Sequence, residues 1–108
     1  MIAIVNAIEL EVDEIDEAIE VYNDFVIPAR KSDPAYAGGH LLMDRKTGKG
    51  IAIVFWNRTL EEHEAYRGSG QDSDYKEAVQ KFQTHMTQQH LPHKSSKTLG
   101  HFEVCTQG

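Results

Sequence analysis

Asn6 and His40 are two polar residues whose surroundings would suit hydrogen-bonding or acid–base chemistry. Asn6 alternates with apolar residues such as Ile4 and Ile8, so its amide must find a partner or cost roughly 1–3 kcal/mol of stability. Either it orients a carbonyl or phenolate oxygen of a substrate, or it bonds neighbouring backbone or a buried water. His40 follows Gly39 in a predicted strand. Its imidazole could act as a general base, or it could be a structural or surface histidine.

Five aromatic residues could wall a pocket for a flat substrate, and packing in the core is the alternative role for each. Trp56 ends an apolar run and Tyr66 follows it in a predicted helix, and both rings could stack on an aromatic molecule. The other three lie on the apolar stripes of predicted helices, where they could pack the core and also line a pocket: Tyr22, Phe25 and Phe82.

Three histidines near the carboxyl end do not form a convincing metal site. His85 and His90 are five residues apart, which places them about 140° apart around a helix. Pro92 interrupts the geometry between His90 and His93. We therefore predict no bound metal. Cys105 has no basic cluster near it in sequence, so no nucleophilic role is assigned to it.

The run from Ile51 to Trp56 contains only β-branched, aromatic and small residues, and it predicts a central strand with both faces covered. Alternation and turn residues predict three further strands, and a capping box at Thr59 and Glu62 predicts a helix directly after the central strand. The predicted elements are a strand at 2–10, a helix from 13, strands at 36–44 and 50–58, a short helix from 59 to 68, a longer helix from 74 to 91, a solvated connection at 93–97 and a strand at 99–106.

An apolar stripe predicts that one side of the first helix is buried. Asp13 is expected to open this helix and Pro28 to kink or end it, while Pro34 prevents its continuation beyond Asp33. The stripe consists of Ile15, Ala18, Ile19, Tyr22, Phe25, Val26 and Ala29.

This order of elements predicts an α+β fold, a ferredoxin-like βαββαβ sandwich in which one antiparallel four-stranded sheet carries its helices on a single face. Two helices leave the other face open, although Ile51, Ile53 and Phe55 make it as apolar as the first. An apolar face of this size is rarely exposed on a monomer. We therefore predict a homodimer joined through the sheet faces.

Length and charge restrict the possible classes of protein. The 108 residues predict one domain spanning 1–108. A net charge of −6 opposes binding to nucleic acid or an anionic membrane surface, and no apolar run approaches the roughly 20 residues of a membrane span. The amino-terminal segment does not have the pattern of a signal peptide, and a single cysteine is compatible with a reducing compartment. We expect a cytoplasmic protein.

Several short motifs resemble the antibiotic biosynthesis monooxygenase-like (ABM) family of dimeric α+β barrel proteins. They are Pro28-Ala29-Arg30, Pro34-Ala35-Tyr36-Ala37-Gly38, Leu41-Leu42-Met43-Asp44, Thr47-Gly48, and a strand ending in Trp56 before a Glu-rich helix. The likeness spans nearly the whole chain, although Ala35 stands where the family usually has glycine. It implies a ferredoxin-like protomer, a homodimer joined through its sheets, and a pocket in each protomer between sheet and helices, near His40.

The activities that the resemblance implies differ in their site residues. Haem-degrading relatives use an Asn of the first strand, which Asn6 matches, but the regions of their Trp and iron-ligating His hold Ala65, Tyr66 and Val79, which disfavours haem degradation. Other relatives are cofactor-independent monooxygenases of aromatic polyketides or quinols. We therefore predict a cofactor-free, monooxygenase-like protein for a small aromatic or quinol-type molecule. The alternatives are a non-catalytic ligand-binding or stress-related dimer, and a domain that only assembles.

Overall fold

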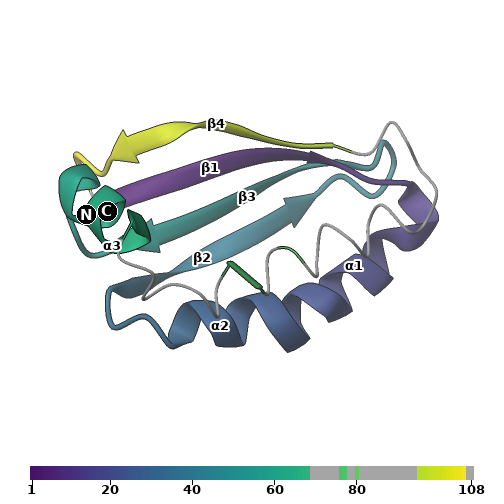
Figure 1. Ribbon diagram of the computed structural model, residues 1–108. Helices are drawn as coiled ribbons and strands as arrows, with labels where there is room; N and C mark the ends of the chain where they lie inside the picture. Colours follow the sequence, from purple (N-terminus) through teal and green to yellow (C-terminus); the bar gives the residue numbers. More distant parts are fainter. Residues whose placement is uncertain (69–75, 78–79, 81–94, 107–108) are drawn as a thin grey trace.

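The computed structural model describes residues 1–68, 76–77, 80 and 95–106 of the chain (Figure 1). The order of elements agrees with the predicted strand, helix, strand, strand, helix, strand pattern within these residues. The elements are β1 (Ile2–Glu9), the 3-10 turn η1 (Val12–Glu14), α1 (Ile15–Val21), the π-helical segment η2 (Tyr22–Val26), α2 (Ile27–Lys31), β2 (Tyr36–Met43), β3 (Lys49–Trp56), α3 (Leu60–Gly68) and β4 (Ser95–Glu103).

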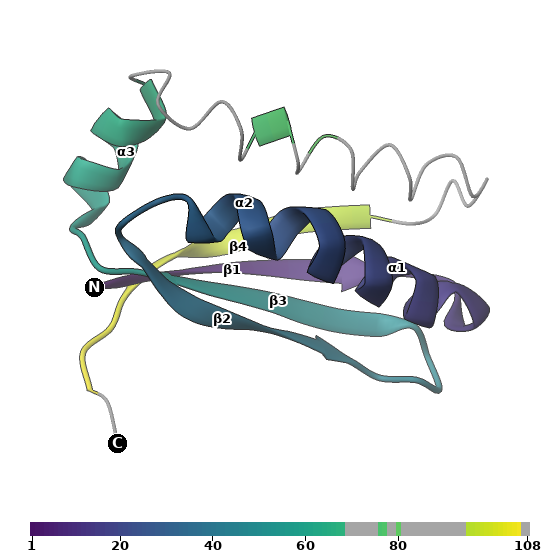
Figure 2. The same ribbon diagram turned by 90° about the horizontal axis from the view of Figure 1, so that it is seen from below.

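The four strands form one antiparallel sheet in the order β2-β3-β1-β4. This order confirms the ferredoxin-like α+β fold, with β3, which contains the uncharged run from Ile51 to Trp56, between β2 and β1 as predicted. Figure 2 shows α1 and α2 lying across one face of the sheet, with no described helix on the other face. None of the described helices is long and apolar enough to cross a bilayer.

The two faces of the sheet are both apolar, but the described helices cover only one of them. On the covered face Ile4 pairs with Val54, and both side chains are buried. On the open face Val5 pairs with Ile53 and is only half-buried. Ala3 is buried there because Phe55 and Phe102 flank it on the two neighbouring strands. The large apolar side chains of the open face are half-buried or exposed: Leu42, Ile51, Ile53, Phe55 and Phe102.

A π-helical segment changes which side chains of the first helix face the sheet. The backbone N–H of Ile27 donates to the carbonyl of Tyr22, five residues earlier, which adds one residue to that turn. The buried positions beyond this point are therefore Val26 and Arg30. The prediction for Phe25 was wrong in this respect, since its side chain is 47% exposed, and Ala29 is only half-buried.

Some predicted boundaries were also wrong. Asp13 lies inside the turn η1, and α1 begins at Ile15 without a side-chain cap. The helix continues past Pro28, which lies in the first turn of α2, and ends at Lys31. β4 begins at Ser95, because this polar end pairs with Glu9 to Ala7 of β1 and needs no apolar side chains. The predicted helix 74–91, with Phe82, His85 and His90, and also His93, lie outside the described residues apart from positions 76, 77 and 80.

Candidate functional site

A groove of about 260 Å³ lies between the first helical layer and the edge strand β2. Tyr22 and His40, two of the residues selected from the sequence, both contribute to its lining, but the strand pairing places the exposed side chain of His40 on the face of β2 away from the helices. Tyr36, which sequence reasoning did not select, also lines the groove. The residues that line the β2 groove are Ile19, Tyr22, Asn23 and Ile27 from the helical segments and Tyr36, Gly39, His40 and Leu41 from β2.

Two glycines shape the strand that forms the groove. Gly38 has a φ of +101°, which L side chains rarely adopt. A Cβ at Gly39 would clash with the carbonyl oxygen of Ile53 on the paired strand. The pairing of β2 with β3 shifts between Tyr36 and Gly39, so the strand is irregular where it lines the groove.

Tyr22 is fixed by a buried arginine. The guanidinium of Arg30 donates a hydrogen bond to the Tyr22 hydroxyl, and its carbon lies 5.0 Å from the centre of the Tyr22 ring. Both side chains are buried, and the π-helical segment is what turns Arg30 toward the core. The phenol of Tyr22 is therefore held in one orientation beside the groove.

Asn6 does not line the β2 groove. It lies on β1, opposite Ala52 of β3 and Thr98 of β4, and is half-buried. Ala52 pairs in turn with Leu41, so alternation places the side chains of Asn6 and Leu41 on one face and that of His40 on the other. The sheet thus separates the two residues that were predicted to act together.

The remaining aromatic candidates lie outside the groove lining. Trp56 is 1% exposed and belongs to the core, where its ring makes an edge contact with Tyr36 at 5.8 Å between centroids. The Tyr66 ring lies beneath the guanidinium of Arg58, at 4.3 Å. Phe25 points away from the core as described above.

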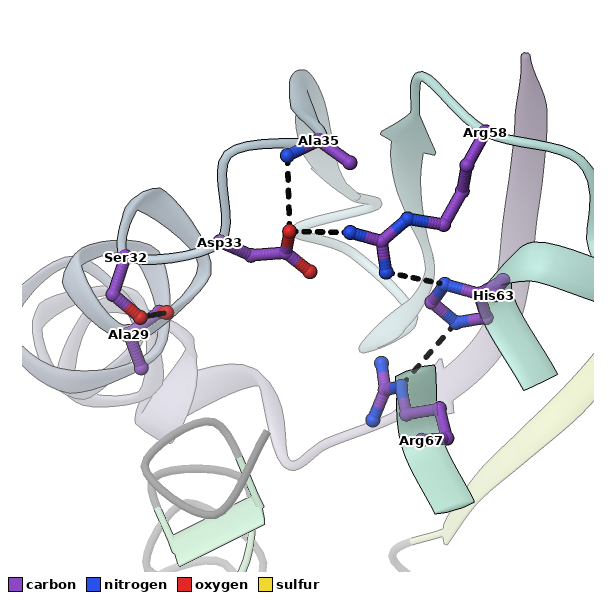
Figure 3. Close-up of polar contacts among 7 residues, drawn as sticks. All are labelled: Ala29, Ser32, Asp33, Ala35, Arg58, His63 and Arg67. Atoms are coloured by element: carbon purple, nitrogen blue, oxygen red, sulfur yellow. Dashed lines mark hydrogen bonds and ion pairs between the residues drawn. The ribbon is translucent and has the colours of Figure 1, made fainter. Parts of the chain in front are cut away.

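A second polar group lies at the end of the sheet where β3 leads into α3, and we call Asp33, Arg58, His63 and Arg67 the guanidinium–imidazole cluster (Figure 3). Asp33 forms a buried ion pair with Arg58 and also accepts the backbone N–H of Ala35 at 2.9 Å. One guanidinium nitrogen of Arg58 lies 3.5 Å from Nδ1 of His63, and Nε of Arg67 donates to Nε2 of the same ring at 3.3 Å.

The start of α3 positions this cluster. Thr59 and Glu62 form the predicted capping box, in which each side chain accepts the backbone N–H of the other residue, at 3.1 and 2.9 Å. These bonds also lower the pKa of Glu62, the one from the Thr59 backbone most. With the helix start fixed, His63 and Arg67, four residues apart, lie on the same side of α3.

His63 is 3% exposed, and its imidazole is held in the neutral form. Burial lowers its pKa to about 4, and the positive charges of Arg67 and Arg58 and the nearby His101 act in the same direction, while Asp33 opposes them. Its ring also lies 5.3 Å from that of Trp56.

Sequence reasoning did not select His63 because it stands among glutamates of a helix expected to face solvent. The available signal was its spacing of four residues from Arg67, behind the capping box. Asp33, the ion-pair partner of Arg58, is distant in sequence, so that contact had no signal of its own. The described residues contain no group of three or more histidine, cysteine or acidic side chains placed to hold a metal ion.

Comparison with known proteins rests on structure alone, because no family model and no curated protein sequence matches the chain. SnoaB, a cofactor-independent oxygenase from Streptomyces nogalater, superimposes with a TM-score of 0.66 at 16% identity, over 98% of this chain and 94% of that one. The haem degrader MhuD from Mycobacterium tuberculosis superimposes with a TM-score of 0.61 at 16% sequence identity, over 100% of this chain and 99% of that one. A structure described as an antibiotic biosynthesis monooxygenase superimposes with a TM-score of 0.57 at 16% sequence identity, over 93% of this chain and 97% of that one. At these identities the likeness shows a shared fold.

Proposed function

From the fold that the chain shares with the antibiotic biosynthesis monooxygenases, we propose that it is a cofactor-independent, monooxygenase-like protein acting on a small aromatic or quinol-type substrate. The observation that carries this proposal is the β2 groove, which lies between sheet and helices and is lined by two tyrosines, with His40 on the edge strand that forms its border. Its volume of about 260 Å³ suits a molecule of one or two fused rings rather than a haem.

The proposed chemistry needs a proton acceptor and an aromatic wall. His40, whose exposed imidazole lies on the edge strand β2, would take the proton of a phenol or enol that reaches past this edge of the groove. Tyr22 and Tyr36 would contact the face or edge of the substrate ring. Asn6, from β1, remains a proposed contact for a substrate oxygen on the covered face. The aromatic side chains proposed to contact the substrate ring are also Phe25, Trp56, Tyr66 and Phe82.

The electron balance of this reaction requires no external reductant. In an anthrone, the reacting carbon loses two hydrogens and becomes a carbonyl carbon. One oxygen atom of dioxygen forms that carbonyl and the other leaves as water with the two hydrogens. Deprotonation by His40 would form the electron-rich anion that reacts with dioxygen.

Oxygen uptake with a panel of hydroquinones and anthrones tests the proposal. We expect His40→Ala and Asn6→Ala each to lower the rate about tenfold or more, as loss of an acid–base or orienting group does. His101→Ala is the matched control, because it removes an exposed imidazole from the opposite edge strand and should leave the rate unchanged. If the protein binds a member of the panel but consumes no oxygen with any of them, the enzyme hypothesis is wrong and the protein binds the ligand without catalysis.

We also infer that two copies pack through their open sheet faces. The support is the row of half-buried and exposed apolar residues on that face, which no described element of the same chain covers. We further propose a cytoplasmic location, for which the single, exposed Cys105 is consistent with a reducing compartment.

A further inference from the structure

The outer edge of β2 presents backbone groups that the described sheet does not use. β2 is the last strand of the sheet on its side, so its backbone groups point alternately toward β3 and outward. The backbone N–H of Asp44, directly after β2, donates to the carbonyl of Lys49 at 2.8 Å, which turns Asp44 toward β3. Alternation back along the regular register then turns every second residue outward. These outward residues are Met43, Leu41 and Gly39.

Two of the outward residues, Gly39 and Leu41, also line the β2 groove. Within the described part of the chain, no backbone group bonds to the outward N–H and C=O of either residue. A ligand that fills the groove removes water from these groups, and each polar group left without a partner costs roughly 1–3 kcal/mol. The groove therefore favours a ligand that carries both a donor and an acceptor at this edge.

Leu41 holds its outward N–H and C=O side by side, because a strand residue in this orientation exchanges both bonds with one residue opposite when a further antiparallel strand is present. A lactam, a ring that contains an amide, presents the complementary C=O and N–H on one edge. We propose that the β2 groove binds planar aromatic lactams of the 2-quinolone type. The lactam C=O would accept from the Leu41 N–H, and the lactam N–H would donate to the Leu41 C=O. Leu41 is preferred to Gly39 because Gly39 borders the register shift of β2.

The rest of the groove suits the rings of such a molecule. Two fused rings fit within about 260 Å³. The aliphatic part of the helical lining comes from Ile19 and Ile27, and the rings of Tyr22 and Tyr36 can contact the face or edge of the ligand. With both polar groups of the lactam bonded at the strand edge, the hydrocarbon part of the molecule is left to contact this lining.

This inference rests on the proposed function for the use of the groove and narrows its aromatic substrate, but binding of a lactam requires no turnover. The two hypotheses can therefore fail separately. Lactam binding without oxygen uptake from any substrate would contradict the proposed function alone. Oxygen uptake with hydroquinones, without any preference for a lactam, would contradict this inference alone.

The test is an NMR titration of the wild-type protein with 2-quinolone, followed through the backbone amide signals. N-methyl-2-quinolone is the matched ligand, because a methyl group replaces its donor and blocks the same edge of the ring. We expect a saturable shift of the Leu41 amide signal with 2-quinolone only. We also expect the N-methyl compound to bind at least about tenfold more weakly, since it leaves a backbone acceptor without a partner.

Three variants locate the binding on the outer edge of β2. Leu41→Pro removes the outward N–H, which the pairing with β3 does not need, and should weaken 2-quinolone binding by about tenfold or more. Leu41→Val has a similar size but keeps the N–H, so it should keep the preference for 2-quinolone over the N-methyl compound. Met43→Pro removes an outward N–H beyond the groove lining and should bind as the wild type does.

The wild-type titration decides the proposal even if Leu41→Pro does not fold. Equal affinity for the two quinolones, or binding of neither, would show that the edge of β2 does not recognise a lactam. A shift of the Leu41 amide signal on dilution of the free protein would also overturn the proposal, because it would show that another copy of the chain pairs with this edge.

Discussion

His63 shows how one residue can make the stability of this protein depend on pH. In the unfolded chain a histidine titrates near pH 6.5, whereas burial and the charges of Arg67 and Arg58 lower the pKa in the folded state to about 4. His101 adds to this effect and Asp33 opposes it. Between these two pKa values the unfolded chain binds a proton that the folded protein does not.

We therefore expect the free energy of unfolding to fall as the pH is lowered from 6.5 to 4, and to lose about 2 kcal/mol from this residue by pH 5. Above pH 6.5 the imidazole is neutral in both states and contributes no pH dependence. Urea unfolding at pH 7 and pH 5 measures the difference. His63→Gln should remove most of it and His40→Gln should not, whereas an unchanged pH dependence in His63→Gln would show that other groups are responsible.

The capping box at the start of α3 is a second case in which single side chains contribute to the stability of the fold. Thr59→Ala removes the hydroxyl that accepts the backbone N–H of Glu62. We expect a loss of about 1 kcal/mol in the free energy of unfolding. Thr106→Ala, at an exposed position near the carboxyl end, is the control and should change the stability by less than about 0.5 kcal/mol.

At the scale of elements, the π-helical segment decides which residues of the first helix are buried. A regular helix would have placed Phe25 against the sheet, but the added residue in this turn moves it outward and leaves Val26, 2% exposed, in the core. A periodicity of 3.6 residues contains no information about such an insertion. The sequence therefore predicted the strands, the helix and most of its buried stripe, but not the position of Arg30.

This arrangement reverses the order of mutational effects that a regular helix predicts. Val26→Ala should cost about 2 kcal/mol, because it leaves a cavity in the core. Phe25→Ala should cost less, although it removes more atoms, because about half of that side chain is already exposed. Equilibrium unfolding of the two variants in urea tests this, and a larger loss for Phe25→Ala would contradict the π-helical geometry.

The edge strand β2 depends on the absence of a side chain at one position. Gly39→Ala would push a methyl group against the Ile53 carbonyl, so we expect the pairing of β2 with β3 to weaken by more than about 1 kcal/mol. Ala37→Ser, at an exposed position of the same strand, is the matched control. Hydrogen exchange of the β2 and β3 amides measures the effect, and equal protection in both variants would show that the strands can move apart at no cost.

At the scale of the whole molecule, the open sheet face determines the proposed assembly. Phe55→Lys places a charge on this face, on a strand inside the sheet and opposite Ala3, and should convert a dimer into monomers at micromolar concentration. Glu20→Lys, on the exposed side of α1, should leave the dimer intact. Sedimentation equilibrium measures both. A wild-type chain that is stably folded as a monomer at micromolar dilution would contradict the proposed homodimer.

The candidate sites were harder to predict from the sequence than the fold, because they depend on how distant parts of the chain meet in the whole molecule. Alternation along Ile2 to Glu9 and Ile51 to Trp56 reports a local property, the face on which a side chain lies. The meeting of Asp33 with Arg58, which in turn lies beside His63, depends instead on how the segment after α2 and the segment after β3 come together at the same end of the sheet. Nothing in the local pattern of any one segment contains that information.

The position of β1 between β3 and β4 also affects how the chain is made. The ribosome releases β1 first, but its neighbours are encoded at residues 49–56 and 95–103. One side of this apolar strand thus stays unpaired until β4 has been synthesised, and contacts so distant in sequence form slowly. During that interval the nascent chain should be a good substrate for ribosome-associated chaperones, and premature termination before residue 95 should yield a fragment that aggregates.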